Sequence, residues 1–196
     1  MTAVYLAMIC GGIAVLYGIV TSGQVLRQSP GDARMQDIAG AIQEGAKAYL
    51  GRQYTTIAVV GIVVAIVLAV TLGWLSTLGF AIGAILSGVA GYVGMIISVR
   101  ANVRTAEAAR TSLQAGLTTA FRSGAVTGML VAGLGLLAIA VFFWYLVGPA
   151  GHAPNDRIIV EALTALAFGA SLISIRADIG RLGEDAAAQP REDRDE

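Results

Sequence analysis

Carboxylates are the groups in this chain that could do chemistry, and one of them stands alone in an apolar stretch. Glu161 lies within an uncharged segment that approaches membrane-spanning length. A carboxylate inside a membrane is by default a candidate for ion transport. Arg157 precedes it by four residues, the spacing of a local ion pair on a helix. We therefore favour an ion pair at the end of a helix over a transport site.

Other reactive groups do not combine into a site. His152 is the single histidine, whereas a metal site needs several ligands, so we interpret it as a loop residue. Cys10 is the single cysteine, which excludes an intramolecular disulfide and suggests a small packed residue. The glycines of residues 133–138 have dinucleotide-binding spacing but follow no strand. We assign no catalytic, cofactor-binding or metal-binding residue from these patterns.

The composition is that of a membrane protein. Of the 196 residues, 56% are hydrophobic and only 13% are charged, whereas about a quarter of a soluble domain is charged. Residues 1–26 carry no charged side chain, and neither do residues 53–99. Both gaps exceed the roughly 20 apolar residues that cross a bilayer. The net charge of zero gives no electrostatic reason to expect nucleic acid as a partner.

Five apolar stretches suggest an all-α, multi-pass transmembrane bundle within residues 1–175. The predicted spans are approximately 3–25, 55–75, 77–99, 124–147 and 158–175. The last is the weakest, because it is short and contains Glu161. We predict cytoplasmic helical loops at 32–54 and 100–122, and a charged, disordered cytoplasmic tail at 176–196.

Basic residues predict the orientation in the membrane. They gather in the two helical loops: Arg27, Arg34, Lys47, Arg52, Arg100, Arg104, Arg110 and Arg122. The positive-inside rule then places these loops and the tail in the cytoplasm and the N-terminus outside. We expect the chain in the cell (inner) membrane. Trp74, Trp144 and Tyr145 fall at the outer span ends, as interfacial aromatic residues should.

Small residues in the third span predict close helix packing. They recur every four residues and so share one helix face: Gly79, Gly83, Ser87 and Gly91. Gly124 and Gly128 begin a shorter version of the pattern in the fourth span.

The two loops have different helical patterns. Residues 35–50 form an amphipathic helix that we expect along the membrane interface before a turn into span two. In the other loop, charged residues follow one another at three- and four-residue steps: Arg100, Arg104, Glu107 and Arg110. A solvated helix extension explains this ladder most simply, and a site for phosphate or a lipid headgroup is the alternative.

Three stretches resemble one family. MQDIAGAIQEGAKAYLGRQY (35–54) resembles the first cytoplasmic loop of membrane-bound, proton-pumping pyrophosphatases. SVRANVRTAEAAR (98–110) with AFRSGAVTG (120–128) is similar to the link between that family's third and fourth spans, and FGASLISI (168–175) to its fifth. The resemblance covers about residues 1–175. It implies the first five spans of a sixteen-span subunit in a homodimer. That enzyme uses Mg²⁺ to hydrolyse pyrophosphate at the cytoplasmic face and moves protons, or in some members sodium, outward.

The resemblance ends after Ile175. The family continues with an arginine, a glycine run and an aspartate-rich segment that holds substrate and metal, but here Asp178 occupies the arginine position. No catalytic residue can therefore be transferred. We expect the N-terminal portion of a pyrophosphate-energised proton pump that is inactive alone. The alternative is a non-enzymatic membrane scaffold or interaction subunit.

Overall fold

Five helices make up the fold. The computed structural model describes the backbone of residues 1–188 and the side chains of residues 1–172. The helices are α1 (Thr2–Leu26), α2 (Ala33–Thr71), α3 (Trp74–Thr111), α4 (Leu113–Val147) and α5 (Arg157–Ala188). α1 to α4 are long and apolar enough to cross a membrane. The predicted all-α, multi-pass fold is confirmed, while membrane crossing by residues 158–175 stays a prediction.

α2 is one continuous helix rather than an interfacial helix followed by a span. The Asp32 side chain caps its start by accepting a 3.0 Å hydrogen bond from the Met35 backbone N–H. The turn that we expected near residue 54 is absent, because no proline interrupts the helical hydrogen bonds there. The turn into α3 lies at Leu72 and Gly73, earlier than the boundary between the predicted spans 55–75 and 77–99. Gly73 has φ 82°, a left-handed conformation that suits glycine.

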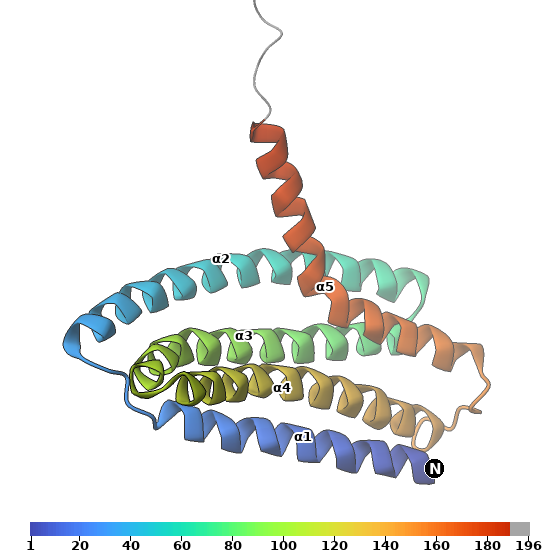
Figure 1. The fold of residues 1–196 in the computed structure, drawn as a ribbon. Helices are drawn as coiled ribbons and strands as arrows, with labels where there is room; N and C mark the ends of the chain where they lie inside the picture. Colours follow the sequence, from blue (N-terminus) through green and yellow to red (C-terminus); the bar gives the residue numbers. More distant parts are fainter. Residues whose placement is uncertain (189–196) are drawn as a thin grey trace, which may run out of the picture.

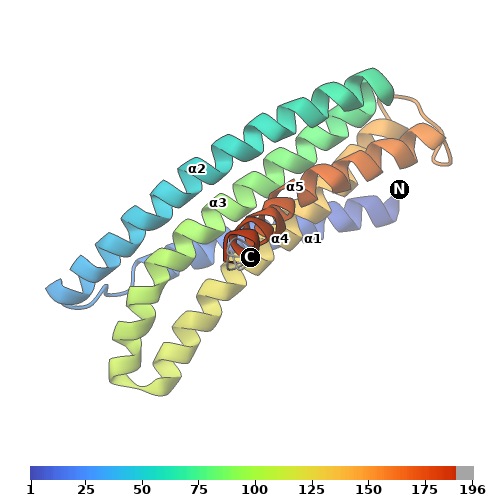
Figure 2. The ribbon, with the colours of Figure 1, turned by 90° about the horizontal axis from the view of Figure 1, so that it is seen from above.

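The predicted helical loop at 100–122 is divided between two helices. α3 continues as far as Thr111, and Ser112 adopts an extended conformation between α3 and α4. The Ser112 hydroxyl accepts a 3.1 Å hydrogen bond from the Ala115 backbone N–H and so caps α4. The resulting α3–α4 hairpin extends past the neighbouring helices (Figure 2).

α3 lies at the centre of the bundle. In the part of the chain that the structure describes, it is the helix that contacts all four others. α1 packs against α4 on one side, and α2 lies along α3 on the other (Figures 1 and 2). α5 crosses α3 and α4 with its first half, and its second half projects away from the bundle (Figure 1).

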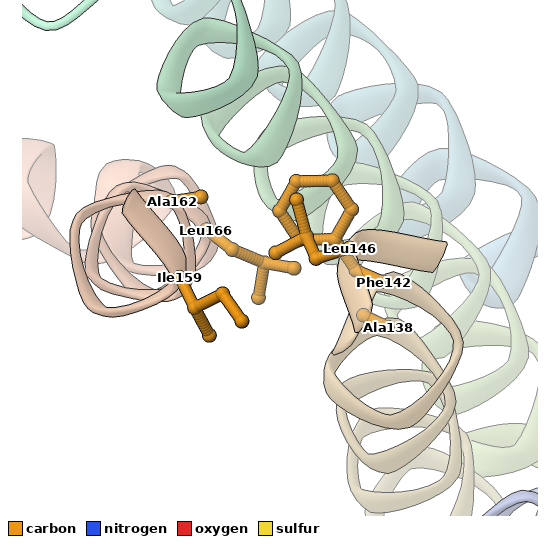
Figure 3. Packing of buried hydrophobic residues seen from close by; sticks show 6 residues of the cluster. All are labelled: Ala138, Phe142, Leu146, Ile159, Ala162 and Leu166. Atoms are coloured by element: carbon orange, nitrogen blue, oxygen red, sulfur yellow. The ribbon is translucent and has the colours of Figure 1, made fainter. Parts of the chain in front are cut away.

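The main apolar cluster joins α4 to α5. Phe142 and Leu146 of α4 point toward Ile159 and Leu166 of α5 (Figure 3). These four side chains are at most 3% exposed. By contrast, none of the most apolar stretch of α2 is buried. Apolar surface on that scale requires lipid or another helix against it, as expected for a membrane protein.

The end of α5 differs from the sequence-based expectation. The predicted boundary between span and tail at residue 175 is not visible in the backbone, because the helix continues to Ala188. Residues 176–188 contain no proline and end in three alanines, which favour helix. The remainder of the predicted tail, 189–196, lies outside the described residues.

Candidate functional site

The closest helix contact in the described structure lies between α3 and α5. A Cβ atom added at Gly79 or Gly83 would overlap the carbonyl oxygens of Ala162 and Leu166, respectively. Gly169 on α5 makes the reciprocal contact, because a Cβ there would overlap the Phe80 carbonyl oxygen. The predicted packing role of Gly79 and Gly83 is thus confirmed. Only glycine lets the two backbones approach this closely.

Ser87 strengthens the same contact with a hydrogen bond. Its Oγ donates to the carbonyl oxygen of Ala170 over 2.7 Å. A hydroxyl in an apolar region needs such a partner, because an unpaired polar group is costly away from water. The third member of the predicted series therefore joins the α3–α5 contact, and for Gly91 the packing role stays a prediction.

The shorter series in α4 does not pack as predicted. No atom comes within 4 Å of a Cβ placed at Gly124 or Gly128, so neither glycine is needed for a contact among the described residues. In α4 it is Gly133 that packs against α1, since its added Cβ would lie 3.0 Å from the Gly11 carbonyl oxygen. Sequence reasoning missed this pair, since neither glycine belongs to a four-residue series.

Arg104 holds the end of α1 against α3. Its Nη2 donates to the Leu26 carbonyl oxygen at 3.0 Å, and its Nε donates to the Gln28 carbonyl oxygen at 3.2 Å. The Leu26 carbonyl belongs to the last turn of α1, where carbonyls have no partner within the helix, and Gln28 follows just after that end. Burial lowers the pKa of Arg104, and the positive charge of Arg100 lowers it further. Arg104 is therefore more than part of a solvated helix surface.

Arg110 makes a second connection at the same end of the bundle. Its Nη1 lies 3.0 Å from Asp32 Oδ2 and 3.2 Å from Glu107 Oε2. The Met35 backbone N–H lowers the pKa of Asp32, and Arg110 lowers it further. The hydrogen bond to Asp32 in turn raises the pKa of Arg110. The start of α2 is thereby tied to the end of α3.

The remaining candidates have local roles. Arg157 Nε lies 2.6 Å from Glu161 Oε1, so the predicted ion pair is confirmed. His152 Nδ1 lies 3.6 Å from Asp156 Oδ2 in the loop before α5. Cys10 is exposed rather than packed, because it lies on a face of α1 that no described helix covers.

Comparison with known proteins places these helices in a family. The sequence profile of the family described as "Inorganic H+ pyrophosphatase" matches residues 12–182. The chain belongs to this family. The matched range contains the residues of the α3–α5 contact and both Arg104 and Arg110 with their partners. These contacts are therefore made within the H+ pyrophosphatase part of the chain.

Curated relatives show how much of such a protein is present. A K(+)-insensitive pyrophosphate-energized proton pump 2 of Moorella thermoacetica is 41% identical over 171 residues, which are 86% of this chain and 24% of that protein. The K(+)-insensitive pyrophosphate-energized proton pump of Methanosarcina mazei is 41% identical over 179 residues, 90% of this chain and 25% of that protein. A putative K(+)-stimulated pyrophosphate-energized sodium pump of Clostridium tetani is 37% identical over 174 residues, which are 89% of this chain and 24% of that protein. This H+ pyrophosphatase chain spans about a quarter of the length of these relatives.

Proposed function

We propose that this chain supplies the N-terminal helices of a pyrophosphate-energised proton pump and does not hydrolyse pyrophosphate by itself. The observation that carries the proposal is the family match over residues 12–182 combined with coverage of about a quarter of the relatives. In this role α3 holds the other helices together. α5 packs against α3 and offers its remaining surface to the rest of the pump. Proton transport is outward, as the resemblance implies.

Mg²⁺ is the metal that the family implies, but the described residues do not suit it. Magnesium on a pyrophosphatase is held by carboxylates together with substrate phosphates, and it offsets phosphate charge during hydrolysis. Among the described residues no three His, Cys, Asp or Glu side chains gather into a possible metal site. Four of the six acidic side chains within residues 1–172 are instead used in ion pairs: Asp32, Glu107, Asp156 and Glu161. No step of hydrolysis is therefore assigned to this chain.

The orientation and assembly are part of the same proposal. The chain lies in the cell (inner) membrane. The helix ends that Arg104 and Arg110 connect face the cytoplasm, and Met1 is on the outer side. The positive-inside rule supports this orientation, since both helical loops are rich in Lys and Arg. Family resemblance supports a homodimer as the assembled form.

Reconstitution tests the proposal. The purified 196-residue chain in liposomes should release no phosphate from magnesium pyrophosphate and acidify no lumen, while the Moorella thermoacetica pump does both. Turnover by the chain alone would overturn the proposed lack of a metal site.

A split-pump experiment tests whether the chain assembles with the rest of a pump. Co-expression with the Moorella thermoacetica pump lacking its matching N-terminal quarter should give a complex that can be co-purified. A Gly83→Leu variant should fail to form it, because the leucine side chain would force α3 and α5 apart. A folded chain that never combines with the remainder would instead favour the membrane scaffold.

A further inference from the structure

We propose that the seam between α2 and α3 is a binding site for one anionic phospholipid. An acyl chain would lie in the apolar part of the seam, and the lipid phosphate would lie between Lys47 and Arg100. The site is independent of pyrophosphate chemistry and rests on two hollows along α2 and α3, the first of which is also lined by Leu172 of α5.

The first hollow has the size and lining that suit an acyl chain. Its volume is about 540 Å³, and its walls are apolar, including Ile57, Ala58, Ile85 and Val89. Along α2 it extends from Tyr54 to Ala65, a rise of about 16 Å at 1.5 Å per residue. Half of the hydrocarbon core of a bilayer is about 15 Å thick. The hollow therefore matches one leaflet.

The hollow offers a water-soluble ligand almost nothing to bind. Tyr54 and Tyr92 carry its polar side-chain groups, and the Tyr54 hydroxyl already donates to the Gly88 carbonyl oxygen at 2.7 Å. The Tyr54 ring also packs edge-to-face against Tyr92, with ring centroids 5.7 Å apart. These two aromatic rings line the end of the first hollow nearest to the basic residues, at the depth where tyrosine favours the membrane interface.

The second hollow places two cations next to that interface. It lies between the same helices, and its lining includes Lys47, Leu50, Val99 and Arg100. Lys47 precedes Tyr54 by seven residues, about 10 Å along the helix axis. The second hollow has a volume of only about 30 Å³, so the phosphate would lie at its mouth, between the exposed Lys47 and Arg100 side chains, with the acyl chain in the first hollow.

The two cations lack an acidic partner in the described structure. Glu107, the acid nearest to Arg100 in the charge ladder, pairs with Arg110. No ion pair is formed by Lys47 or Arg100 among the described residues. The positive charge of Arg100 acts unfavourably on neighbouring Arg104. A lipid phosphate would supply the missing negative charge. On the predicted orientation, it comes from the cytoplasmic leaflet.

Native mass spectrometry of the 196-residue chain tests this site. The detergent-purified chain would be mixed with phosphatidylglycerol or phosphatidylcholine of identical acyl chains, and retained lipid would be counted. We expect one phosphatidylglycerol to be retained preferentially, and Lys47→Gln or Arg100→Gln to weaken its binding about fivefold each. The matched control is Arg122→Gln, which removes the same charge from an exposed residue and should change little.

The acyl-chain part needs its own variant. Ala58→Trp, on the exposed side of α2, should fill the hollow and reduce retention of both lipids, while circular dichroism shows unchanged helix content. Millimolar inorganic phosphate should not displace the bound lipid. Equal retention of the two lipids, displacement by phosphate, or the same loss with Arg122→Gln as with Arg100→Gln would overturn the proposal.

Discussion

Ser87 of α3 donates a 2.7 Å hydrogen bond to the carbonyl oxygen of Ala170 of α5, although the two residues are 83 positions apart. The bond is possible because Gly79 and Gly83, on the same face of α3, bring the two backbones into contact. Close approach and interhelical hydrogen bonding are the interactions that join helices in lipid, where apolar side chains gain little from leaving the solvent. The α3–α5 contact is therefore where this bundle should be most sensitive to substitution.

A single methyl group at Gly83 should destabilise the bundle. In Gly83→Ala the new Cβ would overlap the Leu166 backbone, at a cost of about 1–3 kcal/mol in the free energy of unfolding. Gly135→Ala is the control, because its Cβ meets no atom within 4 Å. Helix propensity should make that control neutral or slightly stabilising. SDS unfolding followed by circular dichroism measures both, and equal stabilities would contradict the prediction.

Removing the Arg104 guanidinium should loosen the end of α1. Arg104→Met leaves the Leu26 and Gln28 carbonyls without their donor and should cost about 1–2 kcal/mol, allowing for partial exposure. Arg104→Lys should recover only part of this, since one ammonium group cannot reproduce the forked geometry of a guanidinium. Arg122→Met is the matched control in the same unfolding assay. A loss as large in the control would show that charge, and not the hydrogen bonds, is responsible.

Acid should weaken the start of α2 through Asp32. The folded protein lowers the pKa of this carboxyl below its ordinary 3.8, so the carboxylate stabilises the fold above that pH. The stabilisation should disappear as the pH falls through the lowered pKa. Protection of the first amides of α2 from hydrogen exchange should then decrease.

Asp32→Asn provides the comparison for this acid effect. It keeps a capping oxygen but cannot titrate, so the difference in protection between wild type and variant should shrink at low pH. A difference that stays constant with pH would show that the acid effect does not come from Asp32.

Cysteine labelling should reveal the predicted orientation. Cys10 is exposed and must first be replaced by serine. Ala106→Cys and Ala153→Cys then report opposite ends of the bundle, and both alanines are exposed in the structure. A membrane-impermeant maleimide should label position 153 on intact cells and position 106 only after permeabilisation. Labelling of position 106 from outside would reverse the orientation.

The amino-acid sequence by itself determined that the chain is all-α and which of its stretches are apolar enough to cross a membrane. Uncharged stretches must form helices in lipid, because each backbone N–H and C=O then finds its partner within the same segment. The same local logic correctly paired Arg157 with Glu161 and placed Gly79 and Gly83 on one packing face. The long family-like motifs also gave the correct family.

Only the tertiary structure decided which surfaces meet. Two acceptors of Arg104, the Leu26 and Gln28 carbonyl oxygens, lie 78 and 76 positions away at and just after the end of α1, and no periodicity in the sequence reveals them. Gly124 and Gly128 have the same spacing as the packing glycines of α3, yet they face open space, whereas Gly133 makes the contact. The physical reason is that helix formation in lipid is satisfied locally, whereas helix pairing depends on the shape and polar groups of a second helix that is distant in the sequence.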